Sequence, residues 1–262
     1  MAYRYGKIIM CIFAHSDTGF AALRAEKRIT AKFGLKGMLM TTKLFFQAII
    51  KFLLGVLLVG LLIFLPAGTL SFLYGWIFMG ILFIPMFFAG IVMMLKNPGL
   101  LKSRLEAKET QKEQDLVVKL SGLMFLLGFV LAGLGYRFGW YMLPKAAVIA
   151  AAVIFLASYV LYAEVLRENT YLSRTIRVEE GQKVVDRGLY GIVRHPMYSA
   201  TLILFLSMPL VLGSVYALVI FLAYPALIAK RIVNEEKFLS KELDGYEDYM
   251  KKVKYRLIPF IW

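Results

Sequence analysis

Four stretches of the sequence are long, apolar and almost free of charge: residues 46–66, 70–95, 120–136 and 143–163. A helix needs about 20 mostly apolar residues to cross the ~30 Å hydrocarbon core of a bilayer. The two charged residues within them, Lys51 and Lys145, lie near the ends, from where a long side chain reaches the membrane interface. The sequence therefore predicts four transmembrane helices.

A fifth apolar stretch, residues 197–229, is too long for one crossing. It has a natural break at Leu212, Gly213 and Ser214, which predicts a tight hairpin of two short helices. The expected fold class is therefore an all-α, polytopic membrane helical bundle with about six transmembrane helices, the last two forming a C-terminal helical hairpin. Five crossings, with a hairpin that only partly enters the membrane, are the alternative.

The positive charges predict the orientation. Of the 31 Lys and Arg residues, only Arg137 and Lys145 fall in the loops of one side when six helices cross the membrane. Since cytoplasmic loops are enriched in Lys and Arg, we expect both termini in the cytoplasm. With 60% hydrophobic and 18% charged residues, the composition excludes a disordered chain and argues against a nucleic-acid-binding domain. A lipid bilayer is the expected partner, with no nucleic acid.

Three regions follow along the chain. Residues 1–40 are expected to be a basic, mobile N-terminal arm without a cleavable signal peptide, because their apolar run is too short. Residues 41–165 form the four-helix transmembrane region, with a cytoplasmic amphipathic segment near 97–118. Residues 166–262 contain a loop, the helical hairpin and a cytoplasmic tail, and they are the expected catalytic region.

The predicted spans contain no Asp, Glu, Arg or His. Transporters, pumps and voltage sensors place ionisable groups at membrane depth, so these classes are disfavoured. One cysteine, Cys11, and two histidines, His15 and His195, argue against a metal site. The polar chemistry is instead concentrated in the cytoplasmic stretches near the C-terminus.

The first of these stretches is the loop 167–193. Its alternating polar and apolar residues around 175–185 favour a short β-hairpin, and Gly188 and Gly191 permit close backbone approaches. A solvated connecting loop is the alternative.

The loop leads into Arg194, His195, Pro196, Met197 and Tyr198, directly before an apolar helix. Proline suits the first helical position because its missing N–H would be unpaired there. A basic pair beside a helix N-terminus favours an anionic group such as a carboxylate or phosphate. The alternative is that the two cations merely flank a span as positive-inside charges.

The second stretch follows the last span. Arg231 and Glu235 are four residues apart and share a helical face, with Glu236 beside them. A surface ion pair is the simple interpretation. However, a hairpin returns this exit point to the beginning of its first helix, which would gather Arg231, Glu235 and Glu236 with Arg194, His195 and Tyr198 in one cluster.

These residues resemble the isoprenylcysteine carboxyl methyltransferase family of integral-membrane enzymes, which is related to phospholipid methyltransferases. The resemblance covers residues 169–262. Its features are Ser173-Arg174-Thr175, Gly188-Leu189-Tyr190, the block 194–198, Arg231 with Glu235-Glu236, Gly245-Tyr246 and the stretch from Tyr255 to Pro259.

The resemblance implies methyl transfer from S-adenosylmethionine to a lipophilic small molecule or lipid-modified substrate, without a metal. It implies that Arg231, Glu235 and His195 are catalytic and that Arg231 and Glu236 bind the substrate. The implied cofactor-binding residues are Gln182, Lys183, Val184, Val185, Tyr190, Arg194, His195, Pro196, Met197, Tyr198 and Glu235.

In the resulting hypothesis, Arg194, His195 and the helix N-terminus hold the cofactor's carboxylate, and Glu235 takes its amino group or ribose hydroxyls. Arg231 orients the acceptor. Methylation of a carboxylate, most simply that of an isoprenylcysteine-like or isoprenoid molecule, is favoured because a carboxylate is already ionised near neutral pH. An amine acceptor would need a base, for which His195 or Glu236 would be candidates.

Three alternatives remain open at this stage. The first is an NADPH-dependent membrane reductase of the sterol-reductase type, with Lys183 or Arg187 near a 2′-phosphate. The second is a phospholipid amine methyltransferase. The third is a non-enzymatic scaffold whose basic face binds anionic lipid.

Overall fold

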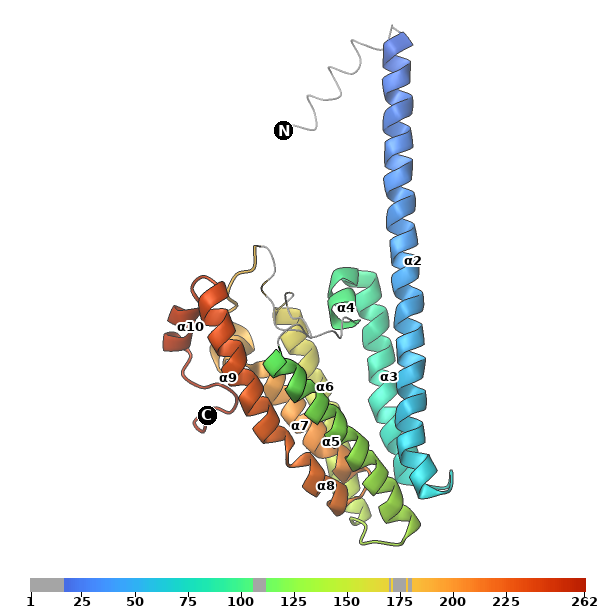
Figure 1. The fold of residues 1–262 in the computed structure, drawn as a ribbon, viewed down its shortest axis with the longest axis vertical. Helices are drawn as coiled ribbons and strands as arrows, with labels where there is room; N and C mark the ends of the chain where they lie inside the picture. The colour runs from blue at the N-terminus through green and yellow to red at the C-terminus, as the bar shows by residue number, and fades with distance from the viewer. Residues whose placement is uncertain (1–16, 106–111, 170, 172–177, 179–180) are drawn as a thin grey trace. The chain divides into compact units, whose positions relative to one another are not determined.

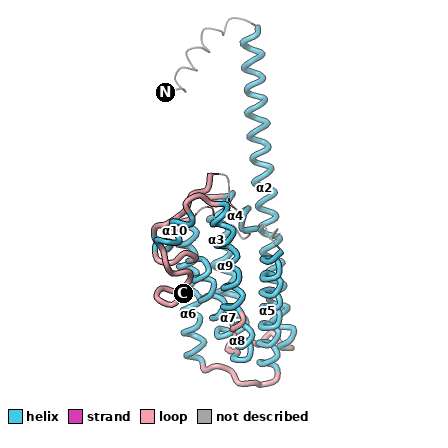
Figure 2. Tube along the Cα trace, turned by 60° about the vertical axis from the view of Figure 1, so that its left-hand side comes forward, coloured by secondary structure: helices cyan, strands magenta, loops and turns pink. Residues whose placement is uncertain are grey.

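The computed structural model describes residues 17–105, 112–169, 171, 178 and 181–262. Residues up to Ile49 form one unit, in which α2 begins, and the helical bundle described below belongs to the second unit, Ile50–Trp262. The helices shown in Figures 1 and 2 are α2 (Asp17–Ala67), α3 (Leu73–Lys96), α4 (Pro98–Leu105), α5 (Lys112–Arg137), α6 (Lys145–Glu168), the 3-10 helix η1 (Gly188–Gly191), α7 (Pro196–Val211), α8 (Val215–Phe221), α9 (Tyr224–Glu242) and α10 (Tyr246–Lys252). The described residues contain no strand, which confirms the all-α prediction.

Five helical segments are long and apolar enough to cross a membrane. Four of them confirm the predicted spans, with ends moved by a few residues: Thr42–Ala67, Leu73–Lys96, Gln114–Arg137 and Lys145–Glu168. The C-terminal hairpin differs from the expected pair of short helices. Its second arm is a 28-residue span, Val215–Glu242, whereas its first arm, α7, has 16 residues and would extend only ~24 Å.

The hairpin turns at the predicted break. Gly213 has φ +72°, and a Cβ there would lie 2.9 Å from the ring of Tyr74, so the turn requires glycine. Ser214 then caps α8 by accepting a hydrogen bond from the N–H of Ala217, at 3.2 Å. A second break separates α8 from α9, where Pro225 lies in the first turn of α9 and lacks the N–H that would continue α8.

The core lies between α3, α5, α6 and the hairpin. Helix α6 packs along α7, and α5 packs against α8 and α9. Aromatic side chains fill the contacts: Phe78 meets Phe129 and Phe155, and Phe221 meets Phe125 and Phe129. Because α7 and the α8–α9 arm are antiparallel, the start of α7 and the end of α9 come to the same end of the bundle, as Figure 1 shows.

Three local predictions have different outcomes. The amphipathic segment near 97–118 is helical over α4 and again from Lys112, and Leu100 and Leu101 are buried in the protein, so α4 is not purely interfacial. The predicted β-hairpin around 175–185 falls mostly on residues outside those described. Its described residues, 178 and 181–185, form no strand. The predicted arm is helical from Asp17, and its mobility stays a prediction.

Candidate functional site

The block that begins α7 is attached to the C-terminal tail. His195 is the residue before the helix and Pro196 is its first residue. The backbone N–H groups of Arg194 and His195 donate to the carbonyl oxygens of Tyr255 and Arg256, each at 2.9 Å. The tail therefore holds the backbone of this block in one position against the end of the bundle.

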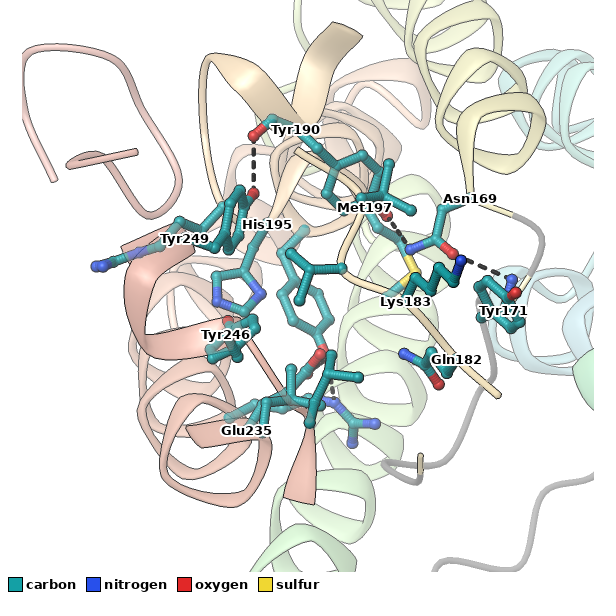
Figure 3. A pocket seen from close by; sticks show the side chains of 17 residues that line it. Asn169, Tyr171, Gln182, Lys183, Tyr190, His195, Met197, Glu235, Tyr246 and Tyr249 are labelled. Atoms are coloured by element: carbon teal, nitrogen blue, oxygen red, sulfur yellow. Dashed lines mark hydrogen bonds between the residues drawn. The ribbon is translucent and has the colours of Figure 1, made fainter. Parts of the chain in front are cut away.

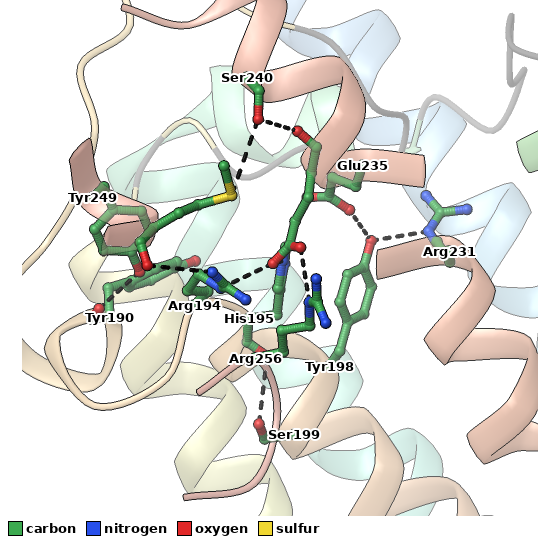
Figure 4. A network of polar contacts seen from close by, with 12 residues as sticks. Tyr190, Arg194, His195, Tyr198, Ser199, Arg231, Glu235, Ser240, Tyr249 and Arg256 are labelled. Atoms are coloured by element: carbon green, nitrogen blue, oxygen red, sulfur yellow. Dashed lines mark hydrogen bonds and ion pairs between the residues drawn. The ribbon is translucent and has the colours of Figure 1, made fainter. Parts of the chain in front are cut away.

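The side chains of α7 and α9 meet at Tyr198. Its hydroxyl donates to a carboxylate oxygen of Glu235 and accepts a hydrogen bond from Nε of Arg231 at 2.9 Å (Figure 4). Tyr198 and Arg231 are buried, at 5% and 9% exposed. The hairpin thus gathers the predicted cluster, and the tyrosine hydroxyl lies between the cation and the anion.

Glu236 is the centre of a second polar cluster. Its Oε1 lies 2.9 Å from Nε of Arg194 and 3.2 Å from Nε2 of His195, and its Oε2 accepts from Nε of Arg256 at 2.8 Å. The Glu236 side chain is only 7% exposed. A buried carboxylate needs such partners, because an unpaired charge is very unfavourable in a protein interior. Glu236 therefore connects α9, the start of α7 and the tail.

The loop after α6 is anchored by Glu168. Its carboxylate accepts from the N–H of Leu189, at 3.1 and 2.9 Å from the two oxygens. Gly188 has φ +60°, and a Cβ there would lie 1.8 Å from Oε1 of Glu168, so only glycine allows this approach. The anchored turn presents Tyr190, whose hydroxyl accepts from the side-chain amide of Asn169 at 3.1 Å.

A pocket lies between these groups, and Figure 3 shows it from close by. Its empty space is about 800 Å³, which includes the open mouth. The lining residues are Asn169, Tyr171, Gln182, Lys183, Val184, Val185, Tyr190, Arg194, His195, Met197, Tyr198, Arg231, Glu235, Leu239, Leu243, Tyr246 and Tyr249.

The lining includes every residue singled out for cofactor binding except Pro196, and it includes Arg231. Glu236, singled out for substrate contact, does not line the pocket, and its carboxylate faces Arg194, His195 and Arg256 instead. This position favours a structural role for Glu236. Arg194 and His195, the two basic residues proposed to bind the cofactor's carboxylate, both contact the carboxylate of Glu236.

Sequence reasoning missed six lining residues: Asn169, Tyr171, Leu239, Leu243, Tyr246 and Tyr249. For Leu239 a signal existed, because it continues the four-residue spacing of Arg231 and Glu235 along one face of α9. Tyr246 and Tyr249 lie on α10, beyond a turn at Gly245 whose φ is +81°. For Tyr246 a signal also existed, because Gly245-Tyr246 is one of the features of the family resemblance, but the sequence pattern does not indicate that α10 returns to the pocket.

The α10 side of the pocket is apolar and aromatic. Leu243, Tyr246, Tyr249 and Val253 form a small buried cluster, with Val184 and Leu239 among the residues packed against it. Tyr249 donates its hydroxyl to the carbonyl oxygen of Tyr190 at 2.7 Å. Burial raises the pKa of Tyr190, Tyr246 and Tyr249 well above the usual value for tyrosine, so their hydroxyls stay protonated near neutral pH.

No group of three or more His, Cys, Asp and Glu side chains that could hold a metal ion occurs among the described residues. The pocket offers cations in Lys183, Arg194 and Arg231, one carboxylate in Glu235, and neutral donors and acceptors beside aliphatic walls. Such a lining suits a ligand with both charged and flat apolar parts.

Two comparisons with known proteins bear on this site. A family model described as phospholipid methyltransferase matches residues 145–244. This range runs from the start of α6 to the end of α9 and holds every lining residue except Tyr246 and Tyr249. The match supports an integral-membrane methyltransferase. It does not distinguish the isoprenylcysteine-specific enzymes within that superfamily.

The chain is also similar to a curated relative, the mouse (Mus musculus) Delta(14)-sterol reductase. The two are 34% identical over 91 residues, which are 34% of this chain and 22% of the reductase. The chain therefore matches only about a fifth of that relative's length.

Proposed function

We propose that this chain is a multi-pass membrane methyltransferase that uses S-adenosylmethionine and methylates a lipophilic acceptor. The observation that carries the proposal is that the methyltransferase-like segment, 145–244, contains nearly the whole lining of a pocket at one end of the bundle. The favoured acceptor group is the carboxylate of an isoprenylcysteine-like or isoprenoid molecule.

The chemical types of the side chains that line the pocket suit this cofactor. Glu235 would hold an ammonium group or ribose hydroxyls, and Lys183 would hold a carboxylate. Val184, Val185 and Leu243 offer apolar surface for a heterocyclic base. The buried hydroxyl of Tyr246 has no hydrogen-bond partner among the described residues, as expected of a group that a ligand completes. When bound, S-adenosylmethionine supplies a methyl group on a positively charged sulfur.

The chain's own residues would chiefly provide alignment. Tyr198 fixes both Arg231 and Glu235 by hydrogen bonds, so the residue proposed to orient the acceptor and the residue proposed to hold the cofactor are mutually positioned. Correct orientation of two reactants contributes about 7–11 kcal/mol toward a barrier. Arg231 would hold the acceptor's carboxylate, which needs no base because it is ionised near neutral pH.

Transfer to an amine would require a group that removes a proton. Both candidates for this role are buried and bonded to each other, since Nε2 of His195 lies 3.2 Å from Oε1 of Glu236. Glu236 also pairs with Arg194 and Arg256. This arrangement favours O-methylation over N-methylation.

The test uses the purified full chain in detergent or nanodiscs. We expect saturable binding of S-adenosylmethionine, and transfer of its labelled methyl group to prenylcysteines or isoprenoid acids. Methyl esters release volatile methanol in base, whereas methylated amines do not, so base treatment separates a carboxylate acceptor from a phospholipid amine. Label that is stable to base, on phosphatidylethanolamine, would overturn the favoured acceptor while leaving a methyltransferase.

The similarity to a sterol reductase favours one second candidate, an NADPH-dependent membrane reductase. Its cofactor carries several phosphate groups, which need a cluster of cations. Of the three cations in the lining, Arg194 is already paired with Glu236, so the pocket lacks such a cluster. Binding of NADPH without binding of S-adenosylmethionine would overturn the methyltransferase proposal in favour of the reductase.

A further inference from the structure

Tyr246 combines three properties that no other lining residue shares. It is 4% exposed, it lines the pocket, and its hydroxyl oxygen is buried with no hydrogen-bond partner among the described residues. A buried, unpaired hydroxyl is unfavourable, and folded proteins rarely keep one without a reason. A ligand that supplies the missing partner would be such a reason.

The surroundings of Tyr246 indicate which part of a ligand it meets. Its ring belongs to the cluster with Leu243, Tyr249 and Val253, against which Val184 and Leu239 pack. Figure 3 shows Tyr246 below the imidazole of His195, on the wall of the pocket formed with Tyr249. A flat apolar wall with one neutral polar group is better suited to bind a heterocyclic base and its sugar than to bind a charged part of a ligand.

We propose that Tyr246 is a ligand-binding residue whose hydroxyl hydrogen-bonds to the adenosine half of the bound cofactor. The inference rests on the proposed function, because S-adenosylmethionine carries adenosine, but NADPH carries it too. Tyr246 lies just beyond the segment 145–244 that matches the family model, so that match does not assign it. The positive φ of Gly245 allows the chain to turn from α9 into α10 and bring Tyr246 to the pocket.

Tyr249 provides a matched control. It is three residues further along the same helix, is equally buried at 4% exposed and lines the same pocket, but its hydroxyl already donates to the carbonyl oxygen of Tyr190. Removing the two hydroxyls one at a time should therefore give opposite results. In Tyr246→Phe an unpaired group is lost, and in Tyr249→Phe an internal hydrogen bond is lost.

The experiment measures the melting temperature of the ligand-free full chain, and the Kd for S-adenosylmethionine and for 5′-methylthioadenosine, which keeps the adenosine but lacks the amino-acid part. For Tyr246→Phe we expect an equal or higher melting temperature and a Kd about three- to tenfold weaker for both ligands, as for the loss of one neutral hydrogen bond. For Tyr249→Phe we expect a lower melting temperature and a smaller loss of affinity.

Unchanged affinity of Tyr246→Phe for both ligands would overturn the inference. A loss confined to S-adenosylmethionine would also overturn it, since the hydroxyl would then contact the amino-acid half. If the wild-type chain binds NADPH and not S-adenosylmethionine, the proposed function fails. The same pair of variants, measured with NADPH, then decides the role of Tyr246 separately.

Discussion

The outer face of α3 and the pocket end of the hairpin are built from different interactions. Along α3, Ile84 and Leu95 are 59% and 78% exposed, as expected for side chains that face lipid. At the pocket end, His195 and Glu236 are each 5% exposed, and both have polar partners on other elements. A lipid-facing apolar side chain can be exchanged for another of its kind, whereas one change at the pocket end breaks several contacts.

This comparison predicts its largest effect at the cluster around Tyr198. We expect Arg231→Ala and Glu235→Ala each to reduce methyl transfer at least about a hundredfold, because each removes a charged group of the pocket and one of the hydrogen bonds of Tyr198. Membrane insertion should remain, since the apolar length of the spans does not change. Labelled methyl transfer and resistance to extraction by alkaline carbonate check the two statements.

Lys230→Ala is the matched control, because Lys230 is exposed and adjacent to Arg231 in sequence. A scaffold that binds anionic lipid through a general basic face would respond equally to the loss of either cation. Full activity in both Arg231→Ala and Glu235→Ala would remove these two residues from the proposed site.

The second prediction concerns stability. Glu236→Gln removes the negative charge shared by Arg194, His195 and Arg256. Breaking a buried ion pair from one side destabilises a protein by about 3–5 kcal/mol, because the remaining charge is left without its counter-ion. We expect a large drop in the melting temperature of the detergent-solubilised chain. Glu242→Gln, an exposed position at the end of the same helix, should change it little, and equal effects of the two would contradict the role of Glu236.

Much of this architecture could be predicted from the sequence, because hydrophobic length is a local property. The four spans and the turn at Leu212–Ser214 follow from runs of apolar residues and from one glycine. The gathering of Tyr198, Arg231 and Glu235 also follows, because a hairpin must bring its two ends together. The three-way pairing of Glu236 could not be predicted, because it needs Arg256 from a tail whose path the sequence pattern leaves open. The break before α9 was missed although Pro225 marks it.

One position in the membrane-spanning part is not expected to tolerate substitution. In α5, a Cβ on Gly133 would lie 2.4 Å from the carbonyl oxygen of Ile63 in α2, so the two backbones approach closely there. We expect Gly133→Ala to destabilise the bundle by about 1–3 kcal/mol, as overpacking does. A Cβ on Gly122 of the same helix would have no neighbour within 4 Å, so Gly122→Ala should leave the melting temperature equal or higher. Tolerance of both substitutions would show that the close approach is unimportant.

The smallest effect is expected where the pocket loop meets α10. Nζ of Lys252 lies 2.7 Å from Oδ2 of Asp186, and both side chains are largely exposed. The hydrogen bond from Lys252, together with its charge, holds the pKa of Asp186 below its usual value. The folded chain therefore favours the carboxylate, and this contribution to stability exists above the pKa of an unfolded Asp, about 3.9. It is lost as the pH falls through the lower pKa of the folded state.

Asp186→Asn should accordingly lower the melting temperature only slightly at pH 7 and low salt, since exposed ion pairs contribute little. The difference from wild type should shrink at about 0.5 M salt, because salt screens exposed charges. It should also shrink as the pH falls through the folded-state pKa of Asp186. Asp248→Asn is the control, because Asp248 pairs with Lys251 within α10 and does not connect the loop to that helix. A difference for Asp186→Asn that persists at high salt would mean that this side chain positions the pocket loop by something other than its charge.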